Sequence, residues 1–142
     1  MIKSLEHVGL GVSDMEKSLE FYRDLLGMEV IMELDISDER IGRVIGVAGA
    51  KCRIAHLKLG NAMLELFEYY EPTGSNKAKE IQQYDHGLIH IGFAVDDFHK
   101  HIEQLQKEGI EFLGEPVEFR PGVWVVYFRG PDGEVCEFRQ QP

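Results

Sequence analysis

The chain has 142 residues, of which 44% are hydrophobic, so it can bury the core of one or two compact units and is neither disordered nor fibrous. Its formal net charge is −10, from 15 Lys and Arg against 25 Asp and Glu, so we expect no nucleic-acid partner. The start has no signal-peptide pattern and no uncharged apolar run reaches membrane-spanning length, so we expect a cytoplasmic protein with no membrane partner.

The first predicted strand, over 7–12, has two unequal faces. Its larger apolar side chains alternate, which places them on one side of a strand. The other side carries only a histidine and two glycines, which leave open space that a core packed for stability alone would fill. We interpret that space as room for a ligand. The two faces are Val8, Leu10 and Val12, and His7, Gly9 and Gly11.

A helix and three strands are predicted to follow. Ser13 and Glu16 form a capping-box pattern at the start of the helix, and Gly27 suits its C-terminal end. Residues with strand character occupy 28–34, 52–59 and 62–70. Between the first two of these strands, the irregular stretch 35–51 is a candidate substrate loop or lid, and 71–84 is predicted to be a linker.

The second half of the chain repeats this design. Residues 7–30 lie over 90–112 with one gap, and such self-similarity indicates duplicated architecture. The copy predicts a strand over 90–95, a helix from Phe98 that ends near Gly109, and strands over 110–117, 123–128 and 134–139. We therefore predict an α+β fold of two tandem βαβββ modules, 1–70 and 85–142. The matched pairs include His7 with His90, Gly9 with Gly92 and Asp14 with Asp97.

Each copy also carries a carboxylate among apolar neighbours in its last strand. These are Glu65 in "AMLELFEY" and Glu137 in "GEVCEFRQ", and charged residues are seldom placed there without a partner. Together with His7 and His90 they offer two imidazoles and two carboxylates, a set that suits a divalent first-row metal with positions left for water or substrate. The alternative is that the histidines are satisfied core residues and the glutamates end in solvent.

The chain resembles the vicinal oxygen chelate superfamily, which includes glyoxalase I, methylmalonyl-CoA epimerase, extradiol dioxygenases and the fosfomycin and bleomycin resistance proteins. The resemblance is carried by "HVGLGVSDMEKSLEFYRDLLGMEV", "MLELFEY", "GLIHIGFAVDD" and "YFRGPDGEVCEF" and covers nearly the whole chain. It implies paired modules whose curled mixed sheets surround a central cavity. It also implies one divalent ion (Ni, Co, Zn, Mn or Fe) with His7, Glu65, His90 and Glu137 as ligands.

The ligand set is most similar to those of glyoxalase I and the epimerase. This resemblance implies a lyase or isomerase that removes a proton next to a metal-polarised carbonyl of a small oxygenated substrate, with Glu137 as base and Glu65 as the second proton-handling group. An extradiol dioxygenase and a metal-free small-molecule binding protein remain the alternatives. Gly11 and Tyr69 stand where bacterial glyoxalase I commonly has arginine and asparagine, so the resemblance does not name the substrate.

Five further residues are candidates for binding the substrate, and we expect the protein to be a homodimer. Aromatic side chains in the seventh strand suit either an apolar pocket or the core. A histidine on an interior strand suits either the cavity or a structural hydrogen bond, and an arginine beside "RPGV" suits either a substrate carboxylate or a surface turn. The five candidates are His56, Tyr69, Arg120, Trp124 and Tyr127.

Overall fold

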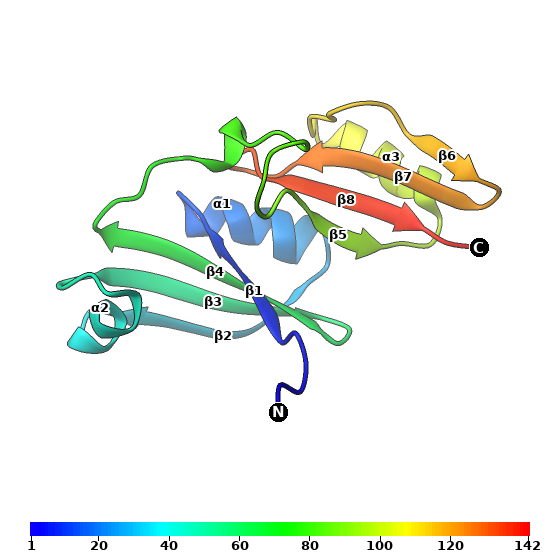
Figure 1. Ribbon diagram of the computed structural model, residues 1–142. Helices are drawn as coiled ribbons and strands as arrows, with labels where there is room; N and C mark the ends of the chain where they lie inside the picture. Colours follow the sequence, from blue (N-terminus) through cyan, green and yellow to red (C-terminus); the bar gives the residue numbers. More distant parts are fainter. The chain divides into compact units, whose positions relative to one another are not determined.

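Two four-stranded sheets make up the computed structural model, which describes residues 1–142 (Figure 1). The chain divides into two compact units, Met1–Ser75 and Asn76–Pro142, and each unit contains one sheet. The strand orders are β1-β4-β3-β2 and β5-β8-β7-β6, so the predicted α+β class and the repeated βαβββ plan are confirmed. No helix combines the length and the apolar character needed to cross a membrane.

The first unit adds one short helix to the βαβββ plan. Its first strand runs parallel to its last, and the other pairings are antiparallel. The first helix continues without a break as a π-helical segment, η1. In chain order the elements are β1 (His7–Gly11), α1 (Met15–Leu19), η1 (Glu20–Leu25), β2 (Glu29–Ile36), α2 (Glu39–Ile45), β3 (Lys51–Leu59) and β4 (Ala62–Glu71).

The second unit has the same topology with shorter strands. Its first and last strands are again parallel neighbours, and the two antiparallel pairings again complete the sheet. A single 3-10 turn, η2, precedes them. The elements are η2 (Ala78–Glu80), β5 (Ile91–Ala94), α3 (Phe98–Lys107), β6 (Val117–Arg120), β7 (Val123–Arg129) and β8 (Val135–Gln140).

Each sheet buries one face against its own long helix. The apolar side chains spaced three or four apart on the helices are almost fully buried, as the helical spacing predicts. Alternate residues of the central strands complete the two cores. The main buried side chains are Met15, Leu19, Tyr22, Leu57, Leu64 and Leu66 in the first unit and Phe98, Ile102, Leu105, Val126, Phe128 and Phe138 in the second.

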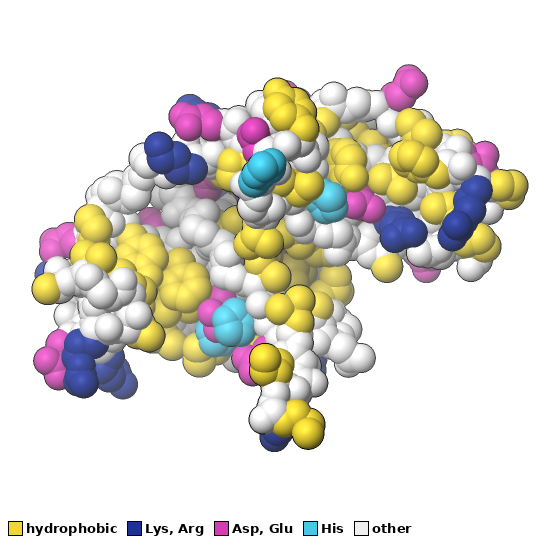
Figure 2. Space-filling model, in the orientation of Figure 1, with side chains coloured by type: hydrophobic (Ala, Val, Ile, Leu, Met, Phe, Trp, Pro, Cys, Tyr) yellow, Lys and Arg dark blue, Asp and Glu magenta, His cyan; other side chains and the backbone are white.

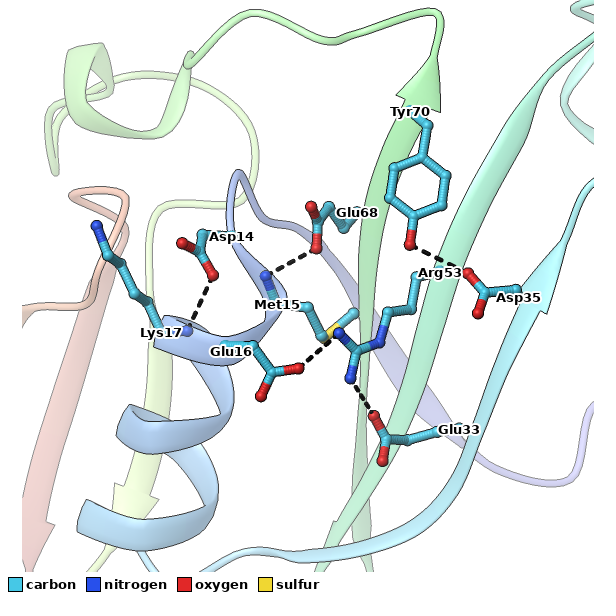
Figure 3. Close-up of polar contacts among 9 residues, drawn as sticks. All are labelled: Asp14, Met15, Glu16, Lys17, Glu33, Asp35, Arg53, Glu68 and Tyr70. Carbon is cyan, nitrogen blue, oxygen red and sulfur yellow. Dashed lines mark hydrogen bonds and ion pairs between the residues drawn. The ribbon is translucent and has the colours of Figure 1, made fainter.

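The last strand of each unit also holds the start of the helix. The backbone N–H of Met15 donates to Oε2 of Glu68 at 2.8 Å (Figure 3), and that of Phe98 donates to Oε1 of Gln140 at 2.9 Å. Both bonds satisfy a donor that a helix leaves unpaired in its first turn. Glu68 and Gln140 each lie three residues after the glutamate that the repeat matches, so the two units share this device.

Arg53 ties α1 to the sheet of the first unit. Its two terminal nitrogens donate to Oε1 of Glu16 on α1 at 2.6 Å and to Oε1 of Glu33 on β2 at 2.8 Å (Figure 3). The capping box predicted from Ser13 is wrong by one residue, because the helix starts one residue later. The N-cap is Asp14, whose Oδ1 accepts from the backbone N–H of Lys17 at 3.2 Å.

The stretch 35–51, predicted to be irregular, contains the end of β2 and the helix α2. Asp38 caps the helix by accepting from the backbone N–H of Arg40 at 2.9 Å, and Gly46 ends it with φ at 76°. Position 42, inside the helix, requires a glycine, because a Cβ there would stand 2.6 Å from the carbonyl oxygen of Val47. This close approach explains why a glycine occupies the middle of the helix.

The strand predicted over 110–117 is placed differently. The strand β6 begins only at Val117, after the "GEP" sequence that ends with Pro116. The earlier residues still reach β7: Leu113 donates its N–H to the carbonyl oxygen of Tyr127 at 3.0 Å, and Phe112 forms an isolated bridge with Phe128. Proline lacks the N–H that a continuous strand requires, so the pairing is broken in two.

Candidate active site

The register of both sheets places a glycine directly opposite the predicted glutamate. Gly9 of β1 pairs with Glu65 of β4, and Gly92 of β5 pairs with Glu137 of β8. Directly opposed residues lie on the same face of a sheet, so each glutamate projects over a position that has no side chain. This is the face that does not pack on α1 in the first unit or on α3 in the second, since Leu64, Leu66 and Phe138 occupy the other one.

In the first unit, Glu65 lies between two imidazoles. Its Oε2 lies 3.2 Å from Nε2 of His7, and its Oε1 lies 2.8 Å from Nε2 of His56. The carboxylate is 14% exposed, and the side chains of His7 and His56 are 39% and 21% exposed. Two contacts from neighbouring strands thus fix both oxygens of a nearly buried carboxylate.

In the second unit, Glu137 pairs with one imidazole and faces a phenol. Its Oε2 lies 2.9 Å from Nε2 of His90, while the ring of Tyr127 lies 5.0 Å from the ring of His90, centroid to centroid. Nδ1 of His90 is 2.8 Å from Oε1 of Gln83. Burial raises the pKa of the Tyr127 phenol above its usual value, and the charge of Glu137 adds to this.

The two units differ at one equivalent position beside the glutamate. His56 of β3 is the antiparallel partner of Glu65, and Tyr127 of β7 is the antiparallel partner of Glu137. A ring from the neighbouring strand therefore lies next to each carboxylate. Of these two rings, only the imidazole of His56 lies within hydrogen-bond distance of its glutamate. The two units thus have the same residue at the histidine of the first strand and at the glutamate, and different residues at the position of His56 and Tyr127.

Open space adjoins both pairs, as the small residues of the first strand predict. A Cβ added at Gly11 or Gly92 would meet no heavy atom within 4 Å, and one at Gly9 would make only an ordinary contact, 3.8 Å from Phe67. An imidazole and a carboxylate next to unfilled space suit a divalent metal ion. No cluster of three or more His, Cys, Asp or Glu side chains arranged to hold a metal is present, so each unit offers a pair of ligands and not a complete set.

An apolar wall lies next to the pair of the first unit. Phe67 and Tyr69 follow Glu65 on the same face of β4, with parallel rings whose centroids are 6.1 Å apart. They pack against a cluster of Ile41 from α2 with Cys52 and other residues of the sheet. Burial raises the pKa of the Tyr69 phenol. Figure 2 shows this face, with hydrophobic side chains over β3 and β4 near a histidine and an acidic side chain.

Two of the predicted substrate-binding residues lie away from the pairs. Trp124 is on the helix-covered face of β7, where its ring stacks on Phe98 at 5.7 Å and meets His99 at 4.6 Å. Arg120 is exposed at the end of β6, opposite Val123. That pairing lies four residues along β7 from Tyr127, or roughly 13 Å at the rise of a strand.

The contacts of His56 and Gln83 with the pairs were missed, and only one had a signal in the sequence. The loop of the β3–β4 hairpin is Gly60-Asn61, and a two-residue loop fixes the register that sets His56 opposite Glu65. Gln83 lies in the stretch 71–84 predicted to be a linker, of which residues 76–84 belong to the second unit. No periodicity or motif distinguishes this glutamine from its neighbour Gln82.

Known proteins are similar to this chain over nearly its whole length. The sequence profile of the Glyoxalase/Bleomycin resistance protein/Dioxygenase superfamily matches residues 4–138. The chain is 32% identical over 149 residues to a 2-epi-5-epi-valiolone epimerase of Actinomyces sp., covering 98% of this chain and 80% of the relative. It is 28% identical over 140 residues to a lactoylglutathione lyase of Neisseria meningitidis serogroup A, covering 96% and 90%.

A solved structure shows the same fold. A glyoxalase family protein from Bacillus cereus matches with a TM-score of 0.92 at 21% identity, covering 100% of this chain and 97% of the other. The sequence profile spans nearly all of the chain, including both histidines and both glutamates. The chain therefore belongs to the glyoxalase, bleomycin resistance protein and dioxygenase superfamily, the vicinal oxygen chelate proteins.

Proposed function

We propose that this chain is a metal-dependent lyase or isomerase that removes a proton from a carbon next to a carbonyl of a small oxygenated substrate. One observation carries the proposal: each unit sets an imidazole and a nearly buried carboxylate beside space that a glycine leaves open. The relatives named as an epimerase and a lyase support the same class of reaction.

His7 and Glu65 from one unit and His90 and Glu137 from the other would hold one divalent ion, such as Ni²⁺, Co²⁺, Zn²⁺, Mn²⁺ or Fe²⁺. Superfamily members commonly use such an ion. Four protein ligands would leave coordination positions of such an ion for the substrate. When bound, the ion would supply Lewis-acid polarisation of the substrate carbonyl, which makes the neighbouring C–H bond more acidic. The two pairs would come from one chain or from two chains of a homodimer.

The two glutamates are not equivalent as proton carriers. Both oxygens of Glu65 are engaged, one by His7 and one by His56, so this carboxylate is held in place. Only Oε2 of Glu137 has a partner, His90. Oε1 of Glu137 is therefore the atom that we assign to accept the substrate proton, and Glu65 is the second proton-handling group.

The side chains around the pairs would position the substrate. Phe67 and Tyr69 offer an apolar wall beside Glu65, and Tyr127 offers a hydroxyl and an aromatic face beside His90. His56 would act on the substrate only through Glu65, which it contacts. An oxygenated substrate with an apolar portion matches these surroundings better than a highly charged one, because no cationic side chain contacts either pair.

Metal content and proton exchange test the proposal. Purified protein is analysed for bound transition metal, and the analysis is repeated on His7→Ala, Glu137→Gln and Glu103→Gln. The last variant removes an exposed carboxylate of α3 and serves as the matched control. We expect bound metal in the wild type and the control and a loss of it in the first two variants. The molar masses of the wild type and the variants in solution, measured by sedimentation, report whether the protein is a dimer.

The reaction itself is followed by NMR in D₂O. Small cyclic hydroxyketones, which are uncharged, are the first set of substrates, and the charged hemithioacetal of glutathione and methylglyoxal is the second. Entry of solvent deuterium at the carbon next to the carbonyl, abolished in Glu137→Gln and retained in Glu103→Gln, supports the proposal. A wild type free of metal that binds these compounds without exchanging the proton is instead a binding protein, and oxygen consumption with a catechol would identify a dioxygenase.

A further inference from the structure

Gln83 bridges the ring of His90 and the backbone just before it. Its Oε1 lies 2.8 Å from Nδ1 of His90, and its Nε2 donates to the carbonyl oxygen of Ile89 at 2.8 Å. Gln83 is half-buried, although its neighbours on both sides are exposed. Two short hydrogen bonds therefore hold the amide of Gln83 in one place within a stretch of mostly exposed residues.

The carbonyl of Ile89 fixes which way the amide of Gln83 points. A carbonyl oxygen can only accept a hydrogen bond, so the group facing it must be the amide nitrogen. The group facing His90 is then the amide oxygen, which also can only accept. Nδ1 of His90 must therefore carry a hydrogen and donate it to Gln83.

The nitrogen on the other side of the ring is thereby left for the site. Nε2 of His90 is the atom 2.9 Å from Oε2 of Glu137. Whatever shares this position with Glu137, a proton or a metal ion, Nδ1 keeps its own hydrogen. Histidines that bind metals commonly donate the second ring N–H to an acceptor, which fixes the ring and raises its basicity.

A turn holds Gln83 at this place. The backbone N–H of Gln82 donates to Oδ2 of Asp85 at 2.7 Å, and the backbone N–H of Asp85 donates to the carbonyl oxygen of Gln82 at 3.0 Å. These reciprocal bonds close the four residues around Gln83 before the chain reaches His90. The amide is thus presented to the imidazole by backbone geometry as well as by its own bonds.

The first unit has a weaker counterpart. Nδ1 of His7 lies 3.2 Å from Oε1 of Glu6, a side chain that is 74% exposed. Water competes for both partners there, and exposed pairs of this kind contribute little. The contrast singles out Gln83 as the acceptor that orients a histidine in a half-buried site.

We propose that Gln83 is a positioning residue that fixes the tautomer and orientation of His90, so that Nε2 is presented to the metal. This inference rests on the proposed function, because it assumes that His90 is a ligand. It assigns a role in the site to a segment whose sequence indicated only a linker. Removing the acceptor should weaken metal binding by about 10- to 100-fold, the usual effect of losing such a partner.

The test compares two neighbouring glutamines. Metal-free protein is titrated with Co²⁺, and affinity is read from the visible spectrum of the bound ion for the wild type, Gln83→Leu, Gln83→Glu and Gln82→Leu. The side chain of Gln82 is exposed and makes only one long bond, to the carbonyl oxygen of Glu80 at 3.4 Å, so it is a matched control. We expect weaker binding in Gln83→Leu, partial recovery in Gln83→Glu, which restores the acceptor for His90 but not the donor to Ile89, and wild-type binding in Gln82→Leu.

A second measurement needs no metal. In ¹⁵N-labelled metal-free protein, the Nδ1–H of His90 should give a resonance protected from solvent exchange in the wild type and in Gln82→Leu, and this resonance should be lost in Gln83→Leu. If the wild type binds no Co²⁺, the proposed function fails, and this resonance alone decides whether Gln83 orients the ring. If the wild type binds Co²⁺ and Gln83→Leu binds it equally well, the inference about Gln83 is overturned while the proposed function stands.

Discussion

Gly92 provides a direct test of whether the face beside Glu137 is kept open for a ligand. A Cβ at this position would meet no atom within 4 Å, and the backbone φ of Gly92 is not in the left-handed region. Nothing in the fold therefore requires glycine here. We expect the substitution Gly92→Val to be accepted by the fold and to crowd the site.

The size of the stability effect follows from the strand. Glycine inside a regular element is destabilising by roughly 0.5–1 kcal/mol, and valine is among the residues favoured in strands. Gly92→Val should thus raise the free energy of unfolding by about 0.5–1 kcal/mol, or the melting temperature by about 1–4 °C for a chain of this size. Metal affinity should fall, because the added methyl groups stand opposite Glu137 in the register of β5 and β8.

Gly109 is the matched control for this experiment. A Cβ there also meets nothing within 4 Å, but its φ is 70°, so Gly109→Val should lower stability by about 1–3 kcal/mol from backbone strain alone. Both variants and the wild type are compared by chemical denaturation followed by circular dichroism and by Co²⁺ titration. The inference that this face is kept open for a ligand is refuted if Gly92→Val lowers the free energy of unfolding by more than about 1 kcal/mol, or if it binds Co²⁺ as tightly as the wild type does.

Three further predictions follow from the fold. Phe128→Ala should cost about 3–5 kcal/mol in urea denaturation because the ring is fully buried, whereas Phe119→Ala, with a ring that is 73% exposed, should change stability by less than about 0.5 kcal/mol. Hydrogen bonds from the side chain and then the backbone of Arg40 lower the pKa of the Asp38 carboxyl from 3.8 to about 2. The stability from this cap is therefore present above pH 3.8 and is lost as the pH falls through about 2, and an NMR titration of Asp38 in Arg40→Gln should show the midpoint rising. Arg53→Met should cost about 1–2 kcal/mol in the same denaturation assay, because it removes two charged hydrogen bonds of a partly exposed side chain, and an unchanged midpoint would show that the bridge from α1 to the sheet contributes nothing.

The repeated architecture could be predicted because both copies obey simple periodic rules. The alternation in β1 and the helical spacing of Met15 and Leu19 are local. The helical spacing places Met15 and Leu19 in the core, and the alternation leaves Val8 and Leu10 partly buried on one face of β1. Aligning His7 with His90 then placed Glu65 and Glu137 in equivalent strands. The structure brings each histidine to the glutamate of its own unit, and the pairing of both with one metal stays a prediction.

The features that could not be predicted depend on tertiary contacts, which the periodic patterns of helices and strands do not reveal. Helix α2 has seven residues and a glycine in the middle, and only the close approach of Val47 to Gly42 explains that glycine. Trp124 follows the alternation of its strand, but the sequence does not say which face of the sheet is covered by the helix. Gln83 reaches His90 because a turn closes around it, a tertiary relation that leaves no mark in composition.

The position of the histidines also predicts the order in which the protein folds. His7 begins β1, an edge strand of five residues, and β5, which follows His90, is an edge strand of four. Each pairs in parallel with the last strand of its unit, so this ladder can close only after the intervening hairpin and helix have formed. The contacts of His7 with Glu65 and of His90 with Glu137 should therefore form last during refolding and separate first on mild denaturation. The cation that we propose for these residues should slow the opening of the two strands.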